Sequence, residues 1–373
     1  MKEATASNQR YLALDVLRGM TVALMILVNN PGSWSHIYAP LKHAAWQGCT
    51  PTDLVFPFFL FVVGASMFFS FAKYGNQLNR ESLLKIGKRT LLIFAIGLFL
   101  NSFPQWSADF SKLRIMGVLQ RIALAYGFAA LIVLSVNKKY LPYLGGTILL
   151  GYWALVVFAG GHEPYSLAGN PASPVDTALL GVNHLYKGFG IPFDPEGVFS
   201  TLPAIVTVLI GYLAGALIKD TPKTKVPSLL SLFGALAVVA GWVWGLGFPI
   251  SKPIWSSSYV LYTAGWAALL MALLIWLIDI KGYSGWTSFF VVFGVNPLFI
   301  FAASGLWGRT MGRMIQVTND DGKIVSGSSW LYNEVFVPIG GNLNGSLMYA
   351  IFHVILFWLL GYVLYKKKIF IKV

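Results

Sequence analysis

The chain has 373 residues, of which 56% are hydrophobic and only 11% are charged. A soluble domain of ordinary composition carries about a quarter charged residues, so this composition excludes a soluble protein and predicts an integral membrane protein. The net charge of +13 comes from 27 Lys and Arg against 14 Asp and Glu, and the single cysteine, Cys49, excludes an intrachain disulfide.

Ten apolar runs are long enough to cross about 30 Å of hydrocarbon, which takes roughly 20 residues. In chain order they cover residues 11–31, 52–72, 88–103, 116–136, 141–160, 199–218, 227–247, 258–279, 286–304 and 344–365. The third is expected to be short or tilted, and the sequence GVNP at 294–297 should interrupt the ninth. These runs predict an all-α, polytopic membrane protein. The absence of an internal repeat or a linker favours a single domain over residues 1–373.

The positive charge is distributed unevenly between the two sides that ten spans would create. The side that holds both termini carries 17 Lys and Arg, and the opposite side carries nine although its loops are longer. Because cytoplasmic loops are enriched in Lys and Arg, both termini are predicted to be cytoplasmic. This orientation accounts for most of the excess charge, so a nucleic-acid partner is not expected. Recognition is expected in the long outward loops.

Polar residues at the two ends of the first span allow more than one interpretation. Asp15 and Arg18 are three positions apart on one helical face, so they can form a structural ion pair; Arg18 can equally receive an anionic cofactor. Asn29 and Asn30 end the span just before Pro31, where capping the helix is the simplest explanation.

His43 and Asp53 lie ten positions apart in KHAAWQGCTPTD, at the start of the second span. Asp53 suits the first turn of a helix, and His43 can be an ordinary interfacial residue. Alternatively, His43 accepts a proton from an amine or hydroxyl, and the carboxylate fixes its tautomer. Spacing does not decide between these interpretations. No pair of histidines has the spacing of a zinc site, so no metal is expected.

Two further outward segments are candidates for binding. RIMGVLQR (114–121) brings Gln120 and Arg121 into a helix, and FDPEGVFST (193–201) carries Asp194 and Glu196. Capping and anchoring explain both segments without a ligand. A cleft lined by such carboxylates and amides would also suit an amino sugar, whose ammonium and hydroxyl groups need these partners.

Five blocks of the sequence together resemble one family. They are LDVLRGMTVALMILVNN, KHAAWQGCTPTDLVFPFFLFVVG, LRIMGVLQRIALAY, FDPEGVFSTLPAIV and PISKPIWSSSYVLYTAG. In this order they resemble the membrane domain of the heparan-alpha-glucosaminide N-acetyltransferase family of transmembrane acyltransferases. The likeness extends from about residue 10 to YKKKIF near the end of the chain. The chain is similar to bacterial members, which lack the family's lumenal N-terminal domain, and this implies a bacterial inner membrane.

The resemblance implies transfer of an acetyl group from cytoplasmic acetyl-CoA to the amine of a glucosamine on the far side of the membrane. His43 matches the family's active-site histidine and Asp53 the aspartate that follows it. Asn29 matches an asparagine near the thioester, although about three more residues separate it from His43 here. The family also implies a homodimer surrounded by membrane lipid.

The remaining assignments follow from the chemistry of the two substrates. The phosphates of acetyl-CoA need cations, for which Arg18, Lys88 and Arg89 are the candidates, with Asn29 near the thioester. The acceptor sugar is expected to contact the following residues: Trp46, Gln120, Arg121, Asp194 and Glu196. The alternative to an enzyme is a transporter or permease for amino sugars or oligosaccharides that uses the same cavity, with His43 and Asp53 as proton or substrate sites.

Overall fold

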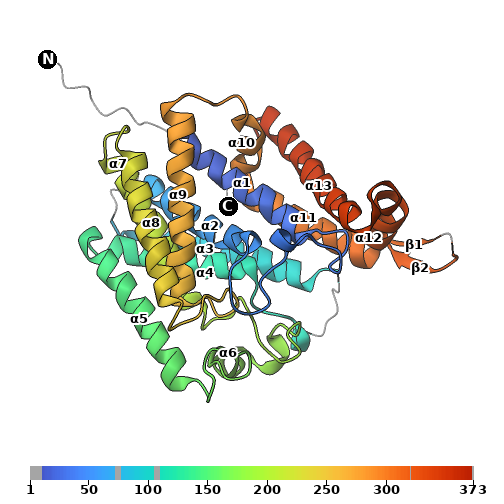
Figure 1. Ribbon diagram of the computed structural model, residues 1–373, viewed down its shortest axis with the longest axis horizontal. Helices are drawn as coiled ribbons and strands as arrows, with labels where there is room; N and C mark the ends of the chain where they lie inside the picture. The colour runs from blue at the N-terminus through green and yellow to red at the C-terminus, as the bar shows by residue number, and fades with distance from the viewer. Residues whose placement is uncertain (1–10, 72–76, 105–109, 320, 372–373) are drawn as a thin grey trace.

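The fold is known from a computed structural model (Figure 1), which describes residues 11–71, 77–104, 110–319 and 321–371. The α-helices are α1 (Leu12–Asn29), α2 (Pro51–Phe71), α3 (Arg80–Ser102), α4 (Val118–Ser135), α5 (Leu141–Ala159), α6 (Ala172–Leu180), α7 (Thr201–Asp220), α8 (Val226–Trp244), α9 (Ser257–Leu274), α10 (Thr287–Val295), α11 (Pro297–Arg309), α12 (Gly327–Trp330) and α13 (Val337–Lys366). Short 3₁₀ segments are η1 (Ala39–Leu41), η3 (Phe110–Lys112), η4 (Lys138–Tyr140) and η5 (Val182–His184), and π-helical segments are η6 (Ile275–Ile280), η7 (Thr310–Met314) and η8 (Leu331–Phe336). The described strands, β1 (Gln316–Thr318) and β2 (Ile324–Ser326), form an antiparallel hairpin that projects from one side of the molecule in Figure 1.

The predicted all-α membrane architecture is confirmed, with a smaller number of clear spans than expected. Among the described residues, eight helices are long and apolar enough to cross a membrane, or nine if the bent pair of α10 and α11 is one span. The tenth predicted span corresponds to α3, which begins at Arg80 rather than at 88 and carries charged side chains in its first turns. A capping box between Asn79 and Ser82 starts this helix in polar sequence. Position 72 of the second predicted span, and the cations Lys2, Arg10, Lys73 and Lys372 of the orientation argument, lie outside the described residues.

The interruption predicted at GVNP is confirmed. The chain bends by 82° between α10 and α11, at Asn296. The Asn296 side chain uses the break to hold the C-terminal segment, because its Nδ2 donates to Ile369 O at 2.9 Å and its Oδ1 accepts from Ile371 N at 2.8 Å. A second irregularity lies inside α13, where Gly341 has a φ of 70°, a value that favours glycine.

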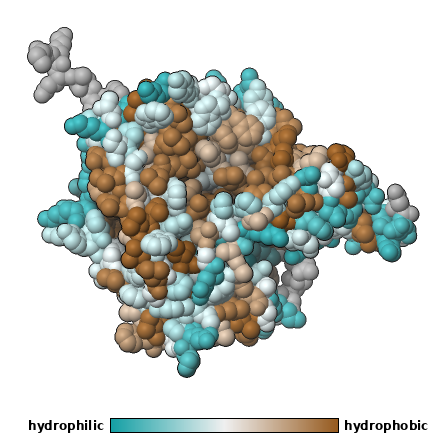
Figure 2. Space-filling view, in the orientation of Figure 1, coloured by the Kyte–Doolittle hydropathy of each residue, from teal (hydrophilic) through white to brown (hydrophobic). Residues whose placement is uncertain are grey.

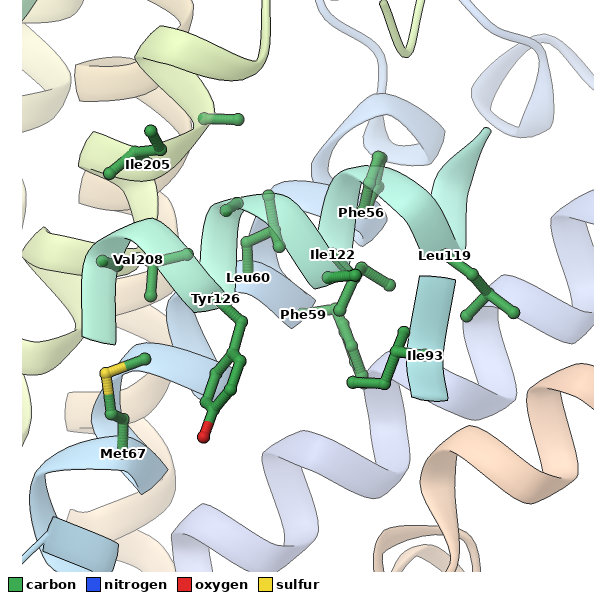
Figure 3. Close-up of a cluster of buried hydrophobic side chains, with 14 of the residues drawn as sticks. Phe56, Phe59, Leu60, Met67, Ile93, Leu119, Ile122, Tyr126, Ile205 and Val208 are labelled. Atoms are coloured by element: carbon green, nitrogen blue, oxygen red, sulfur yellow. The ribbon is translucent and has the colours of Figure 1, made fainter. Parts of the chain in front are cut away.

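The largest apolar core lies between α2, α3, α4 and α7. Figure 3 shows side chains from these helices meeting: Phe56, Phe59, Leu60 and Met67 from α2, Ile93 from α3, Leu119, Ile122 and Tyr126 from α4, and Ile205 and Val208 from α7. Two glycines let α2 and α7 approach closely. A Cβ on Gly64 would lie 2.0 Å from Val208 O, and one on Gly211 would lie 2.0 Å from Phe61 O. This rigid core supports the polar ends of α2, α4 and α7.

Hydrogen bonds join the loops at one end of the helices into a single layer. Ile115 N donates to His184 O at 3.2 Å, Trp46 Nε1 to Tyr165 O at 2.7 Å, and Gly48 N to Ile250 O at 2.7 Å. We call this end, with segments 30–50, 110–117, 160–200 and 245–256, the loop-rich end. The connections 136–140, 221–225 and 281–286 form the opposite, basic end. Between the ends, Figure 2 shows hydrophobic surface over much of the helical face turned to the viewer.

Candidate active site

His43 and Asp53, which the sequence placed ten positions apart, are in direct contact at the loop-rich end. His43 Nδ1 lies 2.6 Å from Asp53 Oδ1. The other carboxylate oxygen, Oδ2, accepts from Ala44 N at 3.0 Å, from Thr50 N at 3.1 Å and from Thr50 Oγ1 at 3.0 Å. The first turn of α2 thus folds the preceding loop around one buried carboxylate.

These contacts define the tautomer of His43. Three donors on Asp53 Oδ2 favour the ionised carboxylate, which has no proton to give, so the Nδ1–H of His43 donates to Asp53 Oδ1. The second ring nitrogen, Nε2, then carries a lone pair. Asp53 is only 1% exposed, whereas the His43 side chain is 40% exposed. The pair therefore presents a basic nitrogen at an accessible position, with its orienting carboxylate buried behind it.

Lys252 is a third member of this cluster, and the sequence argument did not single it out. Its Nζ lies 3.1 Å from His43 Nδ1 and 3.5 Å from Asp53 Oδ1. Burial lowers the pKa of the Lys252 ammonium, while the charge of Asp53 opposes that shift. The segment PISKPIWSSSYVLYTAG was used above only to support the resemblance. A lysine before a membrane helix on the side with fewer cations was the available signal.

Trp46 forms a wall beside this cluster. Its Nε1 donates to Tyr165 O at 2.7 Å, and its ring packs edge-on against Phe189 and Phe193, with centroids 5.9 and 5.2 Å away. Ser251 Oγ donates to Trp46 O at 2.8 Å, which fixes the neighbouring Lys252 segment. The half-buried indole thus links the loop that carries His43 to the segment 160–200.

Asp194 and Glu196 converge on Arg114. Arg114 donates to both oxygens of Asp194, at 2.9 and 2.7 Å, and to Glu196 Oε2 at 2.6 Å. Burial alone would lower the pKa of the Arg114 guanidinium, but the hydrogen bonds and charges of the two carboxylates raise it above its ordinary value. Asp194 is fully buried in this pairing, while Glu196 remains partly accessible and its charge also acts on Lys252.

Gln120 and Arg121 lie side by side in the first turn of α4 but differ in access. Gln120 is 1% exposed and lines the cavity described next. Arg121 is completely buried, donates to Gly197 O at 3.1 Å and to Ser200 Oγ, and lies over the ring of Trp255. Its hydrogen bonds hold the start of α7, so its visible contacts are internal.

A cavity of about 930 Å³ opens beside this network, at the loop-rich end. We call it the polar cavity. Its walls come from the ends of α1, α3, α4 and α11, from η7, α12 and η8, and from the start of α13. Asn29, Asn30, Arg114 and Gln120 line it, whereas His43, Asp53 and Lys252 do not. Arg114 and Glu196 connect the two places, because Arg114 lines the cavity and Glu196 acts on Lys252.

The predicted cofactor cations are distributed over the lower parts of α1 and α3. Arg18 donates to Asp15 Oδ1 at 3.1 Å, to Gly294 O at 3.3 Å and to Ser66 Oγ at 2.6 Å, so it links α1, α2 and α10. Arg89 lies over the ring of Tyr126, at 4.6 Å from its centroid, and Lys88 is exposed. The structure therefore gives Arg18 the internal ion pair that was one of its two interpretations.

The described residues include no group of three or more His, Cys, Asp or Glu side chains that could hold a metal ion. Comparison with known proteins gives a family match over residues 10–242, to the catalytic part of heparan-alpha-glucosaminide N-acetyltransferase. The human protein of that name is 26% identical to this chain, and so is the mouse protein. Each alignment covers 99% of this chain and 61% of the relative, so the chain spans about three-fifths of the length of these curated relatives. His43, Asp53, Asn29, Arg114 and Gln120 all lie inside the matched range.

Proposed function

The chain belongs to the heparan-alpha-glucosaminide N-acetyltransferase family, and from this membership we propose that it moves an acetyl group from acetyl-CoA to the amine of a glucosamine-type sugar. The observation that carries the proposal is the contact between His43 and Asp53, which leaves the accessible Nε2 of His43 as a base. An amine attacking a thioester must lose a proton, and a histidine oriented by a carboxylate is suited to accept it.

The chemistry assigned to the chain is simple to balance. The amine nitrogen forms a bond to the thioester carbonyl carbon, the carbon–sulfur bond breaks, and CoA leaves as the thiol. His43 Nε2 takes the proton from the amine and returns it to the leaving sulfur. Asp53 holds the imidazole and stabilises its positive form, and the Lys252 ammonium keeps a positive charge beside Asp53. Asn29, at the end of α1, supplies an amide donor for the developing oxyanion.

The polar cavity suits the remaining parts of the substrates. Its volume of about 930 Å³ lies near the top of the range of roughly 300–1,000 Å³ usual for ligand sites. Asn29 and Gln120 offer amide groups on its wall. Trp46 and Glu196 border the side nearer to His43, where an amino sugar would find an aromatic face and a carboxylate for its ammonium. Asp194 and Arg121 act on the acceptor indirectly, by holding Arg114 and the start of α7.

The orientation inferred from charge completes the proposal. The basic end faces the cytoplasm of a bacterium, where acetyl-CoA is made available, and the loop-rich end faces outward across the inner membrane, where the amino sugar arrives. Arg18, Lys88 and Arg89 are proposed to guide the phosphates of acetyl-CoA from the basic end. One membrane domain over residues 1–373, assembled as a homodimer in lipid, remains the proposed form of the protein.

An assay on purified protein distinguishes the enzyme from the permease. Detergent-solubilised protein with acetyl-CoA and glucosamine should release free thiol, and mass spectrometry should find N-acetylglucosamine. A permease moves its substrate only between sealed compartments, so it would leave both substrates unchanged in detergent. Absence of product with glucosamine and with a panel of glucosamine-containing glycans would contradict the acetyltransferase proposal.

Cysteine labelling tests the orientation separately. In a Cys49→Ala background, Ser166→Cys should react with an impermeant maleimide added outside intact cells, and Lys223→Cys should react only after lysis. Cys49 itself is a poor thiol nucleophile, because burial, and secondarily the charge of Asp53, raises the pKa of its thiol to about 12. Labelling of position 223 from outside, with position 166 protected, would reverse the model of sidedness.

A further inference from the structure

The polar cavity has a positive charge that its described surroundings do not balance. Arg114, Arg309 and Arg313 line it, and the described lining includes no Asp or Glu. Arg114 is paired with Asp194 and Glu196. For Arg309 and Arg313, no carboxylate of residues 11–71, 77–104, 110–319 or 321–371 comes within 4.0 Å, the distance of a salt bridge.

These two arginines are held at the cavity by the end of α11. Arg309 is in the last turn of that helix, and its Nη1 donates to Gly305 O at 3.2 Å. A Cβ on Gly308 would lie 3.2 Å from Asn30 Oδ1, so this turn packs against the end of α1. Arg313 follows in η7 and is exposed. A guanidinium has five N–H donors, so most of the donors of both side chains have no partner in the described chain.

Ordinary explanations for the pair are weak. A cation in the last turn of a helix gains only about 0.3–1 kcal/mol from the helix dipole, and the charges of Arg313 and Arg114 oppose that of Arg309. The asymmetry that sets membrane orientation favours cations at the other end of the molecule. Neither explanation requires two arginines next to each other on the wall of one cavity. An anionic ligand would remove their mutual repulsion.

We propose that Arg309 and Arg313 bind an anionic group of the acceptor, so that the substrate is an amino sugar carrying a carboxylate, sulfate or phosphate. This inference rests on the proposed acetyl transfer and adds the charge of the acceptor to it. Planar guanidinium groups match the paired oxygens of all three anions. The rest of the wall offers neutral hydrogen-bonding groups suited to sugar hydroxyls: Ser304, Ser328, Tyr332, Asn333 and Asn342.

The test compares neutral and anionic acceptors of the same sugar. We expect wild-type protein to acetylate glucosamine 6-sulfate or glucosamine 6-phosphate with a kcat/KM about 10- to 100-fold above that for glucosamine, the range given by one charged hydrogen-bonded contact. Arg313→Gln, and Arg309→Gln beside it, should reduce this ratio to about one. Lys323→Gln is the matched control, because Lys323 is an exposed cation of the β1–β2 hairpin outside the cavity, and it should keep the wild-type ratio.

Two further measurements make the result decisive. The KM for acetyl-CoA should be the same in wild-type protein and in the arginine variants; if it rises while the acceptor ratio stays constant, the arginines hold the donor phosphates and the proposal is wrong. A wild-type ratio near one would also overturn it. Calorimetric affinities for glucosamine 6-sulfate separate this idea from the proposed function: with no turnover on any sugar, acetyl transfer fails, and binding that Arg313→Gln weakens at least tenfold would still support the anion site. Equal affinity in both proteins would contradict it.

Discussion

The two ends of the molecule use charge in opposite ways. At the basic end the cations are mostly exposed, and the ion pair between Lys138 and Asp220 has both side chains about half exposed. At the loop-rich end the charges are buried or half-buried and are paired across the sequence, as in Arg114 with Asp194 and His43 with Asp53. Exposed pairs contribute little to stability, whereas a buried charge that loses its partner is costly.

This difference indicates what each end does. The basic end needs only an excess of Lys and Arg to orient the helices, so individual residues there are replaceable. The loop-rich end brings together residues 10 to about 200 positions apart, and each pair fixes the geometry of a neighbour. Substitutions should therefore have large and specific effects at the loop-rich end, and small, general effects at the basic end.

The largest expected effect is on turnover in His43→Ala. Removal of a general base typically costs about 10²- to 10⁴-fold in rate, and the exposed imidazole supports little packing. Steady-state acetylation of glucosamine should fall by this factor while the thermal unfolding midpoint stays close to that of the wild type. His162→Ala is the matched control, an exposed histidine of the same end. A stable His43→Ala protein with near wild-type kcat would end the general-base interpretation.

The next effect is on stability, in Arg114→Ala. Removal of the guanidinium leaves Asp194 buried and uncompensated, which typically costs about 3–5 kcal/mol. Denaturation in detergent should show a large loss for this variant and less than about 0.5 kcal/mol for Arg80→Ala at the basic end, where the side chain is exposed. Equal losses in the two variants would remove the distinction between the ends.

Most of the fold was accessible from the sequence, because apolar runs and charge asymmetry report directly on membrane helices. The predicted break at 294–297 lies at the 82° bend between α10 and α11. The start of α3 was missed because the residues that open it, from Arg80 to Arg89, are those of a polar loop, although Asn79 and Ser82 form a helix cap. The helix α6 was also missed, since its nine residues lie in a loop rich in turn-forming residues.

The site was less predictable, because its members are joined by contacts between distant segments. His43 and Asp53 are close in sequence, so their pairing could be anticipated. Lys252 approaches them from 209 positions away, and Arg114 reaches Asp194 across 80 positions. No periodicity or spacing encodes such contacts. The catalytic and binding roles given to Asn29, Trp46 and Gln120 remain predictions.

A smaller effect depends on pH and on the buried carboxyl of Asp176. Burial raises its pKa to about 6. Below about pH 4 the carboxyl is neutral in both folded and unfolded protein. As pH rises towards 6 and above, the unfolded state loses its proton first, so the folded state becomes less stable, by about 2–3 kcal/mol at neutral pH.

Asp176→Asn removes that penalty and keeps an oxygen to accept the hydrogen bond from Phe199 N, which is 2.9 Å long in the wild type. The variant should be more stable than the wild type at pH 7 and about equally stable at pH 4. Thermal unfolding across this range measures the difference. Asp220→Asn at the basic end is the control, with an exposed carboxyl. A wild-type stability that does not fall between pH 4 and 7 relative to Asp176→Asn would contradict the assignment.

The smallest expected effect concerns acetyl-CoA at the basic end. Lys88 is exposed and Arg89 is half-buried over Tyr126, so each contributes at most a partly screened contact to a phosphate, of about 0.2–1 kcal/mol. Lys88→Ala and Arg89→Ala should therefore raise the KM for acetyl-CoA by only about 1.5- to 5-fold, with the KM for the sugar unchanged. Lys138→Ala, another cation of this end, should change neither value. Because positive-inside placement explains the same residues without a ligand, a KM for acetyl-CoA that is identical in all three variants and the wild type would leave orientation as the role of these cations, and would direct the search for the CoA phosphates to the arginines of the polar cavity.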